Sequence, residues 1–89
     1  MKKDIIAIMA EYLDISPDEL ADYKTLENLN IDSLDLAEIM FEIEEKYDVE
    51  IMFELQSHKN EMGNLGDVLR LIEALIVQHK ASKPAENGA

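Results

Sequence analysis

The sequence of 89 residues contains no cysteine, no tryptophan, three glycines and two prolines. The lack of cysteine excludes a disulfide framework, a thiolate metal site and a thiol nucleophile, and it fits a reducing cytoplasm. No run approaches the ~18 apolar residues of a membrane span. Asp4 and Glu11 interrupt the apolar stretch that a signal peptide needs. We therefore expect one small cytoplasmic domain with no membrane segment.

Basic side chains are also scarce, with 8 Lys and Arg against 20 Asp and Glu and a formal net charge of −12. A negative field of this strength repels nucleic-acid phosphates and anionic membranes, and it attracts basic protein surfaces. We expect a monomer whose partners are basic proteins, with no nucleic-acid or membrane partner. His58 and His79 lie far apart in the sequence, so we expect no metal site.

Apolar residues at helical spacing predict three long helices, and no alternating pattern predicts a sheet. The helices cover residues 3–14, residues 32–47, and residues from 64 or 65 to 80. The mixed segment 52–64 predicts a short further helix that ends at Gly63 and Asn64. The expected fold is an all-α, small four-helix bundle over residues 1–80. The polar segment 81–89 is predicted to be a disordered tail.

A long loop is predicted between the first two long helices. Ser16, Pro17 and Glu19 have the arrangement of a capping box with proline at the first helical position, which predicts one short helical turn. The rest of the loop has no regular pattern. We expect Leu26 and Leu29 to hold it against the core.

The second long helix has one apolar stripe and one acidic face. The predicted core side chains are Leu36, Ile39, Met40, Ile43 and Tyr47. A step of 100° per residue places another set outward, with Asp35 at its flank: Leu34, Glu38, Phe41, Glu42 and Glu45. Glutamates on a helix surface are usually just solvated. Leu34 and Phe41, the two apolar side chains among these glutamates, indicate a contact patch.

Polar chemistry concentrates where this helix begins. If Asp32 is the N-cap, then Ser33 is the first helical residue and its hydroxyl lies at the positive end of the helix. A phosphoester on Ser33 fits such a site. Ser and Asp at the start of a helix more often serve only as capping residues. From Asp32 and Ser33 alone, a cap without any attached group therefore stays an open alternative.

The stretch from Leu29 to Asp35, L-N-I-D-S-L-D, closely resembles the acyl carrier protein family, as do the acidic run that follows it and the final N-L-G-D-V-L-R-L-I. The resemblance covers roughly residues 3–78. It implies that a phosphopantetheinyl transferase moves 4′-phosphopantetheine from coenzyme A onto Ser33, with Mg²⁺ present and Asp32 in support. The thiol of this arm would carry acyl groups as thioesters to enzymes of fatty-acid or polyketide-type synthesis. The chain would bear substrates rather than act as an enzyme.

The resemblance also implies a partner-binding face along the second long helix. The matching positions are the outward set together with its flank: Leu34, Asp35, Glu38, Phe41, Glu42 and Glu45. The implied partners are the transferase and acyl-activating, synthase or acyltransferase enzymes with basic docking surfaces. The periodicity and the resemblance thus select the same side chains.

Two departures from the family favour a specialised carrier. Asn30 stands where the family commonly has glycine, and asparagine tolerates the left-handed backbone that such a turn needs. The segment 52–64 looks long for the family, and its Met52, Phe53 and Met62 either form a cargo- or partner-specific surface or fill the core. The alternatives are a free-standing aminoacyl or peptidyl carrier and an unmodified acidic helical adaptor.

Overall fold

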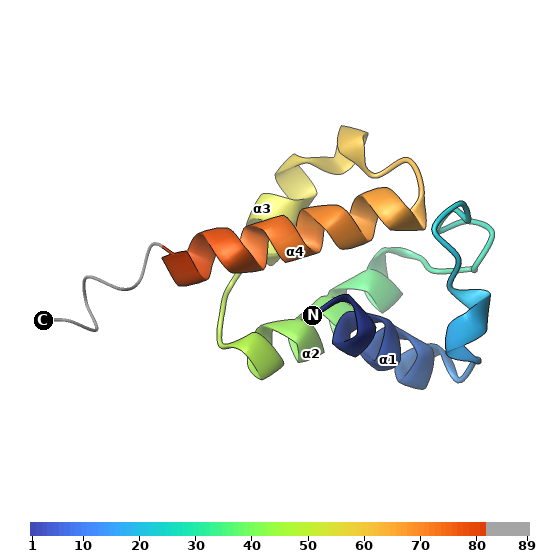
Figure 1. Cartoon of the computed structure of the whole chain (residues 1–89). Coiled ribbons are helices and arrows are strands. Elements are labelled where there is room, and N and C mark those ends of the chain that lie inside the picture. The colour runs from blue at the N-terminus through green and yellow to red at the C-terminus, as the bar shows by residue number, and fades with distance from the viewer. Residues whose placement is uncertain (82–89) are drawn as a thin grey trace, which may run out of the picture.

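The computed structural model describes residues 1–81, in which four α-helices and two 3₁₀ turns form one bundle (Figure 1). The elements are α1 (Lys2–Leu13), η1 (Pro17–Glu19), α2 (Ser33–Tyr47), α3 (Met52–Ser57), η2 (Lys59–Glu61) and α4 (Leu65–Ala81). No strand occurs in this part of the chain, so the predicted all-α bundle with one short helix is confirmed. The predicted tail, 81–89, lies outside the described residues except for Ala81, which ends α4.

The long helices begin and end within two residues of the predicted positions. α1 starts at Lys2 and ends at Leu13, where Asp14 adopts a left-handed conformation with φ 58° and its N–H donates to the carbonyls of Ala10 and Glu11. This bonding satisfies carbonyls that a helix end otherwise leaves unpaired. Within residues 1–81, no helix has the length and apolar character to cross a bilayer.

The core forms where the apolar stripes of the long helices meet. Four of the five residues predicted to face inward from α2 are buried: Leu36, Ile39, Met40 and Ile43. The fifth, Tyr47, is half-buried, and its hydroxyl reaches the Asp4 carboxylate at 3.4 Å. The predicted apolar face of α4 is also buried: Leu65, Val68, Leu69, Ile72, Leu75 and Ile76. α4 lies above α1 in the view of Figure 1, and it contacts both α1 and α3.

The loop between α1 and α2 is tied to the start of α4 by its backbone. The N–H of Leu65 donates to the carbonyl of Lys24 at 2.7 Å, and the N–H of Gly66 donates to that of Asp22 at 3.0 Å. The approach is so close that a Cβ on Gly66 would lie 3.1 Å from the Cβ of Asp22. Leu26 and Leu29 are half-buried against the core, as predicted. The predicted Ser16 capping box is present at η1.

The third helix differs from its prediction. It ends at Ser57, with a separate 3₁₀ turn at Lys59–Glu61, rather than continuing to Gly63 and Asn64. The Ser57 hydroxyl donates to the carbonyl of Glu54 at 2.7 Å, a local bond that competes with helical pairing. The Asn64 side chain instead accepts from the N–H of Asp67 at 2.9 Å, in the first turn of α4. Asn64 therefore supports the start of a helix and not an end.

A single carboxylate joins α2 to α3. One oxygen of Glu44 accepts hydrogen bonds from the N–H groups of Ile51 and Met52, at 2.7 and 2.9 Å. These amides belong to the first turn of α3, whose N-cap residue Ile51 provides no side-chain acceptor. The carboxylate of Glu44 therefore supplies the cap that a six-residue helix lacks in its own sequence.

Replacing Glu44 with alanine should lower the free energy of unfolding by about 1–2 kcal/mol, because two amides lose a charged acceptor. Urea denaturation measures the loss, and amide hydrogen exchange at Ile51 and Met52 should accelerate. Glu45→Ala is the matched control, since it removes the same charge from an exposed neighbouring position. Equal stability of the two variants would contradict the assigned role of Glu44.

Candidate functional site

Ser33 is exposed at the first position of α2, directly after the N-cap residue Asp32. Asp32 and Asp35 form a reciprocal capping box. The N–H of Asp35 donates to the Asp32 carboxylate at 2.8 Å, and the N–H of Asp32 donates to the Asp35 carboxylate at 3.3 Å. Among residues 1–81, no side chain is hydrogen-bonded to the Ser33 hydroxyl. The hydroxyl is therefore open to a reacting partner.

The turn that leads into α2 depends on Asn30. This residue adopts φ 57°, in the left-handed region, so the expectation that asparagine preserves the turn is confirmed. The N–H of Ile31 then donates to the carbonyl of Leu26 at 2.9 Å, and the Ile31 side chain is buried. A buried side chain next to a left-handed residue thus holds the chain immediately before Asp32.

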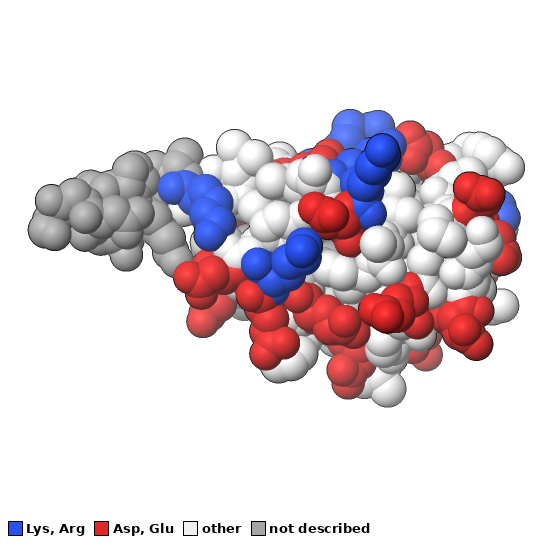
Figure 2. Space-filling model, turned by 60° about the horizontal axis from the view of Figure 1, so that its bottom comes forward, with Lys and Arg blue, Asp and Glu red and all other residues white. Residues whose placement is uncertain are grey.

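The outward face of α2 has the exposure that its periodicity predicts. Leu34 and Phe41 are 68% and 57% exposed. Glu38, Glu42 and Glu45 are exposed as well, and Asp35 is half-buried at the flank. Figure 2 shows Asp and Glu side chains gathered along the lower edge of one molecular face, with the visible Lys and Arg side chains higher in the view. The structure thus brings apolar and acidic groups together on one helix face that begins beside Ser33.

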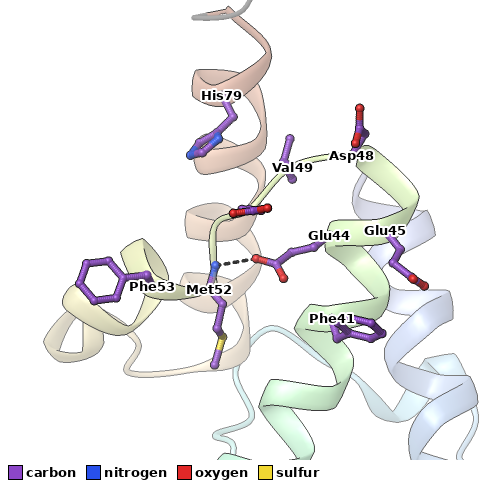
Figure 3. A pocket seen from close by; sticks show the side chains of 9 residues that line it. Phe41, Glu44, Glu45, Asp48, Val49, Met52, Phe53 and His79 are labelled. Carbon is purple, nitrogen blue, oxygen red and sulfur yellow. Dashed lines mark hydrogen bonds between the residues drawn. The ribbon is translucent and has the colours of Figure 1, made fainter.

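A cavity of about 750 Å³ lies at the opposite end of α2, where the chain enters α3. Its walls include Phe41, Met52 and Phe53, and His79 reaches it from α4 (Figure 3). Met52 and Met62 pack against the core, whereas Phe53 is 85% exposed. The alternative that Phe53 fills the core is therefore wrong. The six-residue helix α3 buries Leu55 and leaves Phe53 on the surface.

His79 contributes to this region through a contact that the sequence analysis missed. Its Nε2 lies 2.5 Å from a carboxylate oxygen of Glu54, which joins α4 to α3. The two residues are 25 positions apart, so no local pattern indicates the pair. His58 pairs locally with Glu61. No group of three or more potential metal-ligating side chains occurs within residues 1–81.

Comparison with known proteins assigns a family to this arrangement. Residues 3–72 match the family model described as "Phosphopantetheine attachment site". A protein named acyl carrier protein from a Sulfurovum species is 37% identical over 71 residues, which cover 79% of this chain and 91% of the relative. The chain belongs to the acyl carrier protein family.

Other acyl carrier proteins give the same picture. One from Chlamydia trachomatis is 34% identical over 74 residues, covering 82% of this chain and 92% of the relative. One from Borreliella burgdorferi is 37% identical over 68 residues, covering 75% of this chain and 81% of the relative. No solved structure matched the chain significantly. The match to the phosphopantetheine attachment family covers α1 from its second residue, all of α2 and α3, and the first half of α4.

In this carrier, Tyr12 connects α1 to the capping box of α2. Its hydroxyl donates to the Asp35 carboxylate at 3.2 Å. Desolvation raises the pKa of Tyr12 above its ordinary value of 10.0, and the hydrogen bond and negative charge of Asp35 raise it further. The phenol therefore remains a donor at neutral pH. No local sequence pattern indicates this contact, because Tyr12 and Asp35 are 23 positions apart.

The pKa of Tyr12 is higher in the folded chain than in the unfolded chain. The stability that the protonated phenol contributes is therefore complete below pH 10 and is lost as the pH rises through the folded pKa. Tyr12→Phe should therefore lose less stability than the wild type between pH 9 and about 11. Urea denaturation across this range measures the difference. Tyr23→Phe is the control, since Tyr23 is 78% exposed. Parallel pH profiles for wild type and Tyr12→Phe would contradict the coupling.

Proposed function

We propose that Ser33 accepts the 4′-phosphopantetheine arm and that this chain carries acyl intermediates on it. The observation that supports this most directly is the exposed Ser33 hydroxyl at the first position of a 15-residue helix, inside the segment that matches a phosphopantetheine attachment family. No hydrogen bond among the described residues uses the N–H groups of Ser33 and Leu34. Two amides at the positive helix end thus fit an attached phosphodiester.

The attachment is a phosphoryl transfer. The Ser33 oxygen attacks the pantetheine-side phosphorus of coenzyme A, the bond to the other phosphate breaks, and adenosine 3′,5′-bisphosphate leaves as the serine proton is lost to the transferase. Mg²⁺ held by the transferase neutralises the phosphates. Asp32 and Asp35 serve to hold the helix start in place, since both are engaged in the capping box. The arm supplies the thiol that forms acyl thioesters, which a chain without cysteine cannot provide itself.

The partners are enzymes with basic surfaces that meet the outward face of α2. We assign this contact to Leu34, Asp35, Glu38, Phe41, Glu42 and Glu45. The support is their shared exposure and the net charge of −12, which attracts basic surfaces over a Debye length. Contacts of this kind form quickly and release readily, as a carrier that visits successive enzymes requires. In this proposal the chain presents substrates and performs no catalysis, and it works in the cytoplasm with the synthetic enzymes.

Fatty-acid synthesis is the first choice of pathway class, because the relatives are named acyl carrier proteins. A polyketide-type or aminoacyl cargo would use the same arm and the same serine. Loading assays with an acyl ligase and an amino-acid adenylating enzyme separate these cases. An unmodified adaptor predicts that Ser33→Ala retains function.

The test of the attachment site is intact mass after incubation with coenzyme A, Mg²⁺ and a broad-specificity phosphopantetheinyl transferase. The wild type should gain a single phosphopantetheine, and Ser33→Ala should gain none. Ser57→Ala, which removes another exposed serine, should be modified as the wild type is. Modification of Ser33→Ala, or none of the wild type by a transferase verified on another carrier, would refute the assignment.

The partner face is tested by charge reversal. Glu42→Lys should lower the association rate with the transferase roughly tenfold at low salt, because a basic partner loses attraction and gains repulsion. Surface plasmon resonance at two salt concentrations measures the rate, and the difference should shrink at high salt. Glu27→Lys makes the same change at an exposed loop position. Equal effects of the two variants would mean that net charge alone steers the encounter.

A further inference from the structure

Two tyrosines join α1 to α2, one at each end of the helix pair. The Tyr12 hydroxyl, in the last turn of α1, donates at 3.2 Å to Asp35 in the first turn of α2. The Tyr47 hydroxyl, at the last residue of α2, lies 3.4 Å from the Asp4 carboxylate in the first turn of α1. The two helices therefore run antiparallel, with a phenol and a carboxylate in contact at either end. The Tyr12 contact is the one beside Ser33.

The two phenols are closely matched in their chemistry. Desolvation raises the pKa of Tyr47 above its ordinary value of 10.0, and the negative charge and hydrogen bond of Asp4 raise it further. The pKa of Tyr12 is raised in the same way by desolvation and by Asp35. Both phenols are therefore protonated at neutral pH. Replacing either tyrosine with phenylalanine removes one donor from a carboxylate and leaves the charge of the chain unchanged.

Each oxygen of the Asp35 carboxylate has its own partner. Oδ2 accepts from the N–H of Asp32 at 3.3 Å, and Oδ1 accepts from the Tyr12 hydroxyl at 3.2 Å. The bond from Asp32 is exposed and longer than the usual range for an N–H donor, so water competes for it. A carboxylate that is held at one oxygen turns less freely at the other. Tyr12 thus keeps Oδ2 directed at the Asp32 amide.

The first turn of α2 has little else to fix it to the rest of the protein. Asp32, Ser33 and Leu34 are all exposed, so burial of their side chains does not hold the turn. The capping box joins residues only three positions apart, and it therefore shapes the turn without attaching it to another helix. Tyr12 supplies that attachment from α1, which is itself anchored by buried side chains: Ile5, Met9 and Ala10.

We propose that Tyr12 is a positioning residue for the modification of Ser33, acting through Asp35 to hold the first turn of α2 in place. The inference rests on the proposed attachment of the arm at Ser33. In that step the bond from the serine oxygen to phosphorus forms as the bond to adenosine 3′,5′-bisphosphate breaks, and the serine proton passes to the transferase. The attacking oxygen has to lie in line with the breaking bond, and a displacement of about 1 Å can cost ~100-fold in rate.

The test is single-turnover kinetics of Ser33 modification, with the transferase in excess, coenzyme A and Mg²⁺ present, and intact mass as the readout. The maximal rate for Tyr12→Phe should be roughly fivefold lower than for the wild type, because the serine is aligned for a smaller fraction of the time. The half-saturating transferase concentration should be unchanged, since the substitution alters no charge that attracts the enzyme.

Tyr47→Phe is the matched control. It makes the same chemical change between the same two helices, but Tyr47 lies 14 residues after Ser33, about 21 Å along the axis at the α-helical rise. It should be modified at the wild-type rate even if urea denaturation shows an equal loss of stability in the two variants. Amide hydrogen exchange at Asp32 and Asp35 should accelerate in Tyr12→Phe and stay unchanged in Tyr47→Phe.

A double-mutant cycle tests whether Tyr12 acts through Asp35. Asp35→Ala removes the acceptor, so adding Tyr12→Phe to it should not lower the maximal rate any further. Maximal rates are the quantity to compare, because Asp35 also belongs to the proposed partner face and its loss weakens binding. An equal effect of Tyr12→Phe with and without Asp35 would mean that the phenol acts on the transferase directly, and the positioning role would be wrong.

Two further results would overturn the proposal. One is an equal loss of maximal rate in Tyr12→Phe and Tyr47→Phe, which would assign the loss to overall stability. The other is modification of Tyr12→Phe at the wild-type rate. That result refutes the positioning role and leaves the attachment site intact, whereas no modification of the wild type by a transferase verified on another carrier refutes the carrier proposal itself.

Discussion

Burial of the aliphatic stripe of α2 is the interaction on which the rest of this structure depends. Ile39, Met40 and Ile43 are fully inaccessible, and each such side chain contributes about 1.5–3 kcal/mol when it leaves water. Once these residues face the common core, the rotation of α2 about its own axis is determined. Leu34, Phe41 and the glutamates then have to face outward. The hydrophobic core thus sets the orientation of the functional face, although it contains none of its residues.

The ends of the helices are held by polar side chains in a chain with few glycines. The left-handed positions Asp14, Asn30 and Asp48 are all non-glycine, and no described glycine has positive φ. Short polar side chains tolerate this conformation better than most residues do. Their rigidity relative to glycine suits the proposed attachment site at Ser33, which follows the left-handed residue Asn30 by three positions. Asp32 and Asp35 then complete the start of α2 by pairing with each other's amides.

The charge of this protein opposes its stability and supports its proposed function. Twenty acidic side chains on 89 residues repel one another in the folded state. The exposed rings of Phe41 and Phe53 likewise forgo burial. Both features place groups with strong binding potential on the surface of a small domain, which is typical where function limits stability. A carrier that meets many enzymes gains from a charge that steers the encounter and from a few apolar groups that distinguish between partners.

The long helices, the start of α2 and the face that α2 turns outward could all be predicted from the sequence, because helical periodicity and capping are local properties of neighbouring residues. Segment 52–64 was less predictable, since its residues have no clear period and its helix ends through a local serine bond. The Tyr12–Asp35 and His79–Glu54 contacts and the cavity between Phe41 and Phe53 come from side chains on different helices. Only tertiary packing decided these, because the distance between two helices depends on how every core side chain fits.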